Sequence, residues 1–331
     1  LIEMKNLTRI DKLLWTGLKS LPDIGISALY TSKKAKSKAS AQLTFIGKKK
    51  IEKVQSQLYK YNAEDIEKKE SVKDFSFLSK PDDQVNYWLN FHGIHNVSTI
   101  KKVGEQVDLD RLTLRQILDT TQRPKFEHYS DYIYFAVKSI SKEVAGQLTF
   151  EQLSFVLGKN YVISFQEEEG DHFQFIRTKI EDGVGFIRQR NSDYLACQLL
   201  DAIMDNYFEV IEVINKELAM VEERVFEGSD KSVLIALEGT KRSTSLIKSA
   251  LGPFKDALIS ISQVESSLIR SANVKYFKDL SNNALMAIEE VDTILKNVEG
   301  LTNIYFATQS QKMNETMKVL TTVATLFIPL T

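Results

Sequence analysis

Carboxylates spaced by four residues are the clearest candidates for chemistry in this sequence. Asp201, Asp205 and Glu209 recur at this interval within a segment, 193–227, that is rich in acids and poor in bases. On a helix they would share one face, repel one another along it and concentrate divalent cations beside it. The alternative is an ordinary solvated helix face, which charge runs commonly form. Both interpretations require a helix at this position.

Other candidates for chemistry are incomplete. His92 and His95 follow an apolar run but lack the further ligands of a zinc site, so structural or turn roles suit them better. Residues 167–169 with Asp171 and His172 resemble an acidic metal cluster, and equally a loop whose acids favour a following helix N-terminus. Nothing supplies a nucleophile, a base and an oxyanion site together. The sequence therefore does not predict an enzyme.

Composition narrows the class of protein. The chain has 331 residues with 43 Lys and Arg against 44 Asp and Glu, a net charge of −1 that carries no nucleic-acid signature. Its one cysteine, Cys197, lies in an apolar run and is expected to be a buried thiol in a reducing cytosol. No continuous apolar stretch opens the chain as a signal peptide would.

The first part of the chain, 1–191, alternates strand-like and helical stretches, which predicts an α/β (α+β) domain. Gly158, Lys159 and Asn160 suit a tight hairpin turn, so the sheet should be mixed and flanked by helices. The expected strands are Gln42–Ile46, Val85–Phe91, Tyr132–Ser139, Leu148–Leu157 and Tyr161–Phe165. The expected helices are Thr99–Glu105, Leu112–Asp119 and His172–Gln189.

The second part, 192–271, is expected to be a pair of antiparallel helices. The first helix would cover Asp193–Glu227, which contains neither Gly nor Pro, and residues 228–230 combine a stop signal with an N-cap. The second would run from Lys231 toward Ile269, with a kink at Gly252 and Pro253.

The third part, 272–331, is expected to be one long stalk helix from about Tyr276 onward, roughly 80 Å in length. Its apolar residues alternate three and four apart, and such a 3.5-residue repeat favours helices packed against copies of themselves. The repeat consists of Ile288, Val291, Leu295, Val298 and Tyr305, with one weak position, Thr302, before the last.

The end of the stalk loses its charge. The thirteen residues from Val319 onward carry none, whereas a membrane crossing needs about 20 apolar residues. We expect the chain to stop within a first transmembrane helix, and the rest to be the cytoplasmic part of a protein of the inner or plasma membrane. One stripe of this end alternates by three and four and would suit a pore lining or, alternatively, ordinary bundle packing. That stripe is Asn314, Met317, Thr321, Ala324, Ile328 and Thr331.

Several motifs resemble the CorA family of magnesium channels, in order and nearly without gaps from about Val85 to Thr331. They are Gln122-Arg123-Pro124-Lys125 with Glu127, the hairpin EQLSFVLGKNYVISFQE followed by Gly170, Asp171 and Phe173, the helix DYLACQLLDAIMDNYFEVIEVINKELAMVEE, and the tail MNETMKVLTTVATLFIPLT. The Gly-Met-Asn signature of the family would lie beyond Thr331.

The resemblance implies a funnel-shaped homopentamer whose long helix lines a pore for passive, potential-driven entry of Mg²⁺, with Co²⁺ or Ni²⁺ as further ions. It implies a hydrophobic gate at Met317, Leu320, Ala324 and Ile328, with Asn314 just below it. It also implies that Mg²⁺, bound between acidic residues of neighbouring subunits, holds the pore closed.

For that regulatory site the resemblance assigns Asp279 and Asp201, but the partner positions depart from the family. Arg115 and Gln116 stand where Glu and Asp are common. Gln116 offers a neutral carbonyl and Arg115 adds a positive charge, so one hypothesis is a fixed bridge from Arg115 to Asp279 of the next subunit. The other is a site shifted to neighbours such as Asp119.

Two other functions stay open from the sequence. One is transport of zinc, as in another branch of the same superfamily. The other is a membrane-tethered helical scaffold that oligomerises without conducting ions. A second apolar span after the Gly-Met-Asn signature would favour the channel.

Overall fold

Seven strands form a single mixed sheet in the part of the chain that the computed structural model describes, which is residues 42–142, 148–170, 172–227 and 231–328. The strand order is β2-β1-β3-β7-β6-β5-β4, in which β3 and β7 pair in parallel and all other neighbours are antiparallel. The predicted mixed sheet is confirmed. The strands are β1 Gln55–Tyr61, β2 Ile66–Glu70, β3 Asn86–His92, β4 Lys125–His128, β5 Ile133–Lys142, β6 Leu148–Leu157 and β7 Tyr161–Gln166.

The four strands richest in apolar residues agree with the sequence, and the expected bounds of β6 are those observed. The missed strands are β1, β2 and β4. The last two lie at the edges of the sheet and read IEKKE and KFEH. Charged edge strands discourage pairing with other chains, and the same charges remove the apolar signal from which a strand is predicted.

Two expected elements are wrong in extent. Gln42–Ile46 is not a strand, because Ile46 makes an isolated bridge to Asp119 at the end of a helix, where no ladder can continue. The helix expected over His172–Gln189 is α5, Gln174–Asp182, and it ends at Gly183 in the left-handed conformation (φ 68°).

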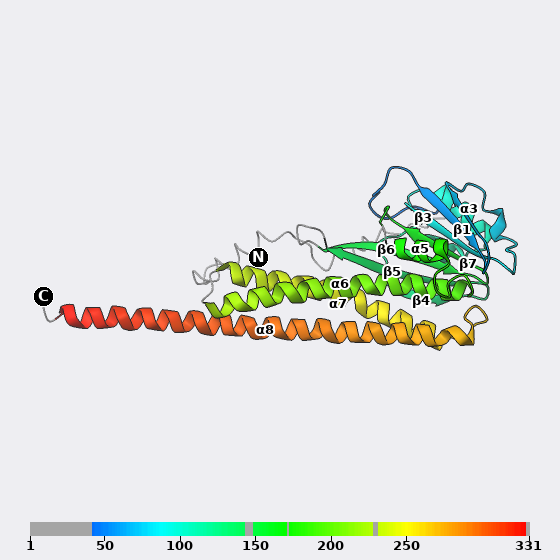
Figure 1. The fold of residues 1–331 in the computed structure, drawn as a ribbon. Helices are drawn as coiled ribbons and strands as arrows, with labels where there is room; N and C mark the ends of the chain where they lie inside the picture. Colours follow the sequence, from blue (N-terminus) through cyan, green and yellow to red (C-terminus); the bar gives the residue numbers. More distant parts are fainter. Residues whose placement is uncertain (1–41, 143–147, 171, 228–230, 329–331) are drawn as a thin grey trace. The chain divides into compact units, whose positions relative to one another are not determined.

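Each face of the sheet has its own apolar cover. Alternate residues of β3, such as Leu89 and Phe91, join a core with α3 (Val97–Gln106), α4 (Arg111–Ile117) and the short 3-10 helix Ser76–Leu78. Trp88 points to the opposite face, where Phe173 packs edge-on against it at 6.1 Å between ring centroids. Figure 1 shows α3 on the side of the sheet away from α6.

Three long helices follow the sheet: α6 Ser192–Glu227, α7 Lys231–Gln263 and α8 Ser271–Phe327. The predicted α6 is confirmed, and residues 228–230 lie outside the described residues. The second helix ends six residues before Ile269 and includes Pro253 without a break in the helix. The third begins at Ser271, earlier than the expected Tyr276.

The chain divides into two compact units. One contains Ile26–Ile211 and Ile247–Glu289, and therefore holds the sheet, α3 to α5 and the adjoining ends of the long helices. The other contains Glu212–Leu246 and Glu290–Thr331. In this second unit the amide of Asn215 on α6 donates to Glu290 on α8 at 2.7 Å.

The apolar repeat on α8 is explained largely within one chain. The positions buried in a single copy alternate three and four apart and include Val291, Val298 and Tyr305 of the predicted repeat, whereas Ile288 and Leu295 are half-buried. Packing within one chain therefore accounts for part of this repeat, and packing between copies stays a prediction for the rest. The buried series is Leu280, Ala284, Ala287, Val291, Ile294, Val298, Leu301 and Tyr305.

Candidate functional site

The acidic face of α6 begins at its boundary with the buried core. Leu199, Leu200 and Ile203 are fully buried, whereas Asp201 is half-buried and Asp205 is exposed. Burial raises the pKa of the Asp201 carboxyl, the carboxylates of Asp205 and Asp279 raise it further, and the Lys179 ammonium opposes them. The charged form of Asp201 is therefore disfavoured by its surroundings, and Lys179 offsets only part of that effect.

Asp279 stands on the foot of α8 and is exposed, between the buried side chains of Phe277 and Leu280. It acts electrostatically on Asp201, and both carboxylates act on the buried thiol of Cys197, whose pKa is raised first by burial and then by these charges. The fold thus places the two predicted metal residues, which are 78 positions apart in the chain, within electrostatic range of each other.

Arg115 and Gln116 face different surroundings at the end of α4. Arg115 is exposed, whereas Gln116 is buried and its Nε2 donates to Oε1 of Glu127 at 2.9 Å. Lys125 approaches the same carboxylate at 3.3 Å. Gln116 is thus engaged with the residues of the Gln122–Glu127 motif, and Arg115 is the member of the pair that is available to another molecule.

A single copy does not complete a metal site within the residues that the structure describes, since they contain no group of three or more His, Cys, Asp or Glu side chains placed to hold an ion. The donor chemistry nevertheless fits a hard cation, because Asp201 and Asp279 offer carboxylate oxygens, which Mg²⁺ prefers. A site here needs further ligands from water or from another copy.

The end of α8 has no cover from its own chain. Every described residue from Gln311 to Ile328 is exposed, and these include Asn314, Met317 and Leu320 with Ala324. None of the helices in the described ranges is long and apolar enough to cross a membrane. The predicted Thr331 lies outside the described residues.

Threonines on this end satisfy their own hydroxyls. Thr321 donates to the carbonyl of Met317 at 2.8 Å, and Thr325 donates to that of Thr321 at the same distance. A hydroxyl bonded to the carbonyl four residues earlier leaves its methyl group facing outward. The surface of this end of α8 is therefore more apolar than its composition indicates.

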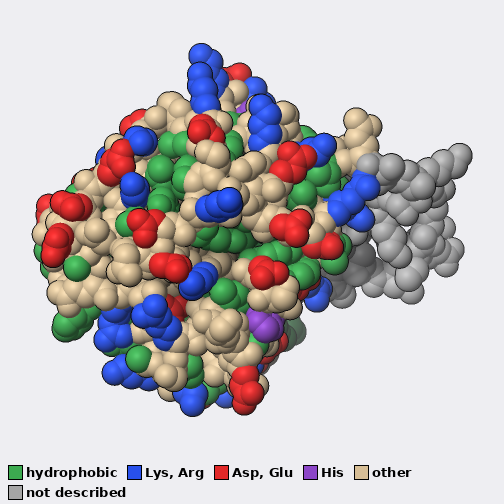
Figure 2. Space-filling view, turned by 90° about the vertical axis from the view of Figure 1, so that its right-hand side faces the viewer, with side chains coloured by type: hydrophobic (Ala, Val, Ile, Leu, Met, Phe, Trp, Pro, Cys, Tyr) green, Lys and Arg blue, Asp and Glu red, His purple; other side chains and the backbone are tan. Residues whose placement is uncertain are grey.

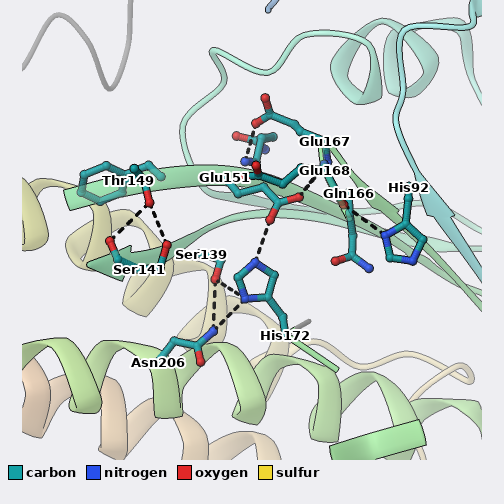
Figure 3. A network of polar contacts seen from close by, with 12 residues as sticks. His92, Ser139, Ser141, Thr149, Glu151, Gln166, Glu167, Glu168, His172 and Asn206 are labelled. Carbon is teal, nitrogen blue, oxygen red and sulfur yellow. Dashed lines mark hydrogen bonds and ion pairs between the residues drawn. The ribbon is translucent and has the colours of Figure 1, made fainter. Parts of the chain in front are cut away.

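A buried polar network that the sequence did not predict joins the sheet to α6 (Figure 3). Glu151 on β6 accepts from the backbone N–H groups of Glu167 and Glu168 at 2.8 and 3.1 Å and contacts Nε2 of His172 at 2.7 Å. The other ring nitrogen of His172 lies 3.1 Å from the amide of Asn206 on α6. This network fixes the strand-to-helix loop that the sequence compared with a metal cluster.

Two lysines, Lys50 and Lys138, act electrostatically on the acids of the loop after β7. Lys50 lies 3.1 Å from Glu168 and 3.6 Å from Glu167. Lys138 is buried on β5, where its Nζ donates to the carbonyl of Thr120 at 2.6 Å. Burial lowers the pKa of Lys138 to about 8, while Glu167 opposes the shift. The sequence did not predict that Lys138 is buried, because a polar residue that alternates with apolar ones in a strand usually faces solvent.

The histidines near β3 have internal roles. His92 contacts the Asn90 amide at 3.0 Å and the Glu168 carbonyl at 3.1 Å, one through each ring nitrogen. His95 packs edge-on against Phe45. These contacts agree with structural roles for both, since His92 ends β3 and His95 follows it in the loop.

Comparisons with known proteins cover most of the chain. A family model described as CorA-like Mg²⁺ transporter protein matches residues 83–331. The cobalt/magnesium transport protein CorA of Thermotoga maritima is 33% identical over 290 residues, which is 87% of this chain and 82% of that protein. The putative metal ion transporter YfjQ of Bacillus subtilis is 22% identical over 74% of this chain and 75% of its own length.

Solved structures share the fold. The complete CorA magnesium transporter of Methanocaldococcus jannaschii superimposes with a TM-score of 0.70 at 18% identity, covering 82% of this chain and 83% of that one. The ZntB cytoplasmic domain of Vibrio parahaemolyticus gives 0.62 at 15% identity, covering 77% and 98%.

Proposed function

This chain belongs to the CorA-like Mg²⁺ transporter family, and on that premise we propose that it forms the cytoplasmic, metal-sensing part of a divalent-cation channel in the inner or plasma membrane. The observation that carries the proposal is α8 itself. One unbroken helix bears Asp279 near its start and the uncovered stripe from Asn314 to Ile328 at its end. Because the helix is continuous, a movement of its start near Asp279 also moves its C-terminal end.

Conduction requires several copies of α8 around one axis. In the homopentamer that we propose, Asn314, Met317, Thr321, Ala324, Ile328 and Thr331 line the pore, and Met317, Leu320, Ala324 and Ile328 form its hydrophobic gate. Such a ring blocks ions by excluding water, and a small tilt of the helices readmits it. The support is that this end carries no charge from Val319 onward, that its described residues are uncovered by their own chain, and that every threonine hydroxyl among residues 311–328 is bonded to a backbone carbonyl.

The membrane potential suffices to drive uptake. A divalent cation gains about 4.6 kcal/mol per 100 mV of inward-negative potential, twice the value for one charge. The transported ion is Mg²⁺, with Co²⁺ and Ni²⁺ as further substrates. The family is one of ion transporters, and we propose no catalytic reaction and no nucleic-acid partner. On the face in Figure 2, acidic and basic side chains are interspersed.

Gating in this proposal depends on charge between subunits. Asp201 of one copy repels acids of the next unless a cation lies between them, and loss of that cation loosens the ring. For Asp279 we propose a fixed bridge to the exposed Arg115 of a neighbouring copy. Asp119 is a weaker replacement ligand, because its Oδ1 already accepts from the Thr121 backbone at 3.0 Å and hydroxyl at 2.6 Å.

We further propose that the three parts 1–191, 192–271 and 272–331 act as sensor, lever and stalk. Two other functions are candidates besides the Mg²⁺ channel. Zinc transport is the second candidate, since the shared fold extends to a ZntB domain. A non-conducting scaffold is the third.

Uptake by the full-length protein in liposomes tests the proposal. Mg²⁺, Co²⁺ and Zn²⁺ are compared, with and without an imposed inward-negative potential. We expect uptake of Mg²⁺ and Co²⁺ that rises with the potential. Uptake of Zn²⁺ alone, dependent on a proton gradient, would favour the zinc transporter, and no uptake of any ion would favour the scaffold.

A further inference from the structure

Lys179 lies in the last turn of α5, and its ammonium reaches α6 (Ser192–Glu227). Nζ donates to Oε1 of Gln198 at 3.4 Å and lies 4.2 Å from the centroid of the Phe175 ring, one turn earlier in α5. Because an aromatic face attracts a cation, Phe175 and Gln198 hold the ammonium from two sides. Both belong to the same chain as Lys179, so this arrangement does not depend on assembly.

Gln198 marks the start of the acidic face of α6. Asp201 and Asp205 follow it by three and seven positions, so all three residues lie on one side of the helix. An ammonium bound to Gln198 therefore stands beside the two carboxylates. The electrostatics agree, because burial raises the pKa of both Asp201 and Asp205 and the charge of Lys179 opposes the shift in each.

The Lys179 ammonium lies near the surface and can move away from Gln198 and the carboxylates of α6. Its neighbour Phe175 is 66% exposed, and Lys179 itself is half-buried, so the side chain can swing toward solvent without opening the core. Four rotatable bonds give lysine this reach, whereas its compact charge still neutralises nearby acids when it returns.

We propose that Lys179 is a built-in competitor for the divalent cation at Asp201, which raises the metal concentration at which the sensor responds. This inference rests on the proposed metal role of Asp201. When the ion is absent, the ammonium offsets part of the repulsion along α6. When the ion binds, it repels the ammonium, and the cost of that repulsion weakens binding. Lys179 acts within one copy, in contrast to the bridge proposed for Arg115.

Calorimetric titration of the 331-residue chain with MgCl₂ and with CoCl₂ tests the inference. Lys179→Gln should tighten binding by about ten-fold, the effect of removing one charge from within about 6 Å of a divalent ion in a water-like dielectric. Lys179→Arg keeps the charge and should bind like the wild type. Lys101→Gln removes an exposed helical lysine from α3 and is the matched control, and Asp201→Asn should weaken binding.

The possible results distinguish this inference from the proposed metal role of Asp201, on which it rests. Binding that Asp201→Asn weakens but Lys179→Gln leaves unchanged would overturn the competitor role alone. Absence of binding in the wild type and in Lys179→Gln would overturn the metal role of Asp201 together with the inference. Denaturant unfolding of each variant confirms that it is folded before titration.

Discussion

Asp193 in the first turn of α6 accepts a hydrogen bond from the backbone N–H of Arg270, just before α8, with 2.9 Å between nitrogen and Oδ2. The same oxygen accepts from the Asn273 amide at 2.9 Å, and Asn273 in turn accepts from Arg190 at 2.5 Å. The starts of the two helices that carry Asp201 and Asp279 are therefore tied together. The connecting carboxylate, that of Asp193, is buried, since the residue is 1% exposed.

Asp193→Ala should destabilise the chain by about 2 kcal/mol, because the Arg270 N–H and the Asn273 amide lose a charged acceptor in a buried place. Chemical denaturation measures the change. Asp256→Ala, at an exposed position of α7 beside Lys255, should change stability by no more than about 0.5 kcal/mol. Equal effects of the two substitutions would contradict a special role for Asp193.

Glu151→Ala should cost about 3 kcal/mol, since two backbone N–H groups and His172 lose their acceptor together. Glu151→Gln should cost less, because its amide oxygen can still accept from the backbone. Thermal unfolding ranks the variants. The exposed pair of Lys101 and Glu105 supplies the control, and Glu105→Ala should be nearly neutral. A Glu151→Ala variant as stable as this control would contradict the prediction.

Lys138 should make stability depend on pH above neutrality. Burial lowers its pKa to about 8 in the folded chain, below the value near 10.4 of an unfolded lysine, so unfolding takes up a proton between these values. The free energy of unfolding of the wild type should therefore rise relative to Lys138→Met by up to about 3 kcal/mol from pH 8 to 10.

Denaturant unfolding at several pH values measures this difference. The control is Lys102→Met, which removes an exposed lysine from α3. Parallel curves for Lys138→Met and the wild type would show that Lys138 is not titrating in this range.

Met317→Asp in the full-length protein should produce a leak of divalent cations, because a ring of carboxylates admits water where methionine excludes it. Ion flux into liposomes is the measurement, at matched amounts of inserted protein. Met317→Leu keeps the constriction apolar and should stay closed. A Met317→Asp channel that does not leak would show that the gate is not at Met317.

Arg115→Glu should create Mg²⁺-dependent protection from proteolysis in the assembled protein. Arg115 is exposed, so its replacement adds a carboxylate toward Asp279 of a neighbour without disturbing the buried contact of Gln116 with Glu127. Protection is compared in Mg²⁺ and in chelator. Arg111→Glu, also exposed on α4, is the control. Strong Mg²⁺ protection of the wild type that acts through Asp279, and is therefore lost in Asp279→Asn, would defeat the fixed-bridge proposal.

The elements with strong periodicity could be predicted from the sequence. The helix over Asp193–Glu227 agrees with α6, and the apolar run Leu148–Leu157 coincides with β6. The edge strands β2 and β4 could not be predicted, because their charged residues carry no apolar pattern and their pairing partners decide their structure. Gly183 ended α5 early for a local reason, its left-handed backbone, which the sequence analysis overlooked.

For the candidate site, the sequence by itself determined which side chains have the required chemistry. The acids of α6 and the uncharged end of α8 follow from residue types and spacing, whereas Asp279 was assigned through the family resemblance carried by the ordered motifs. Only the tertiary structure decided which of them meet. Lys179 donates to Gln198, three residues before Asp201, Gln116 faces inward while Arg115 faces outward, and most of the α8 repeat is buried within its own chain. The physical reason is that spacing fixes neighbours along one helix, whereas charge and burial are set by elements that are distant in sequence.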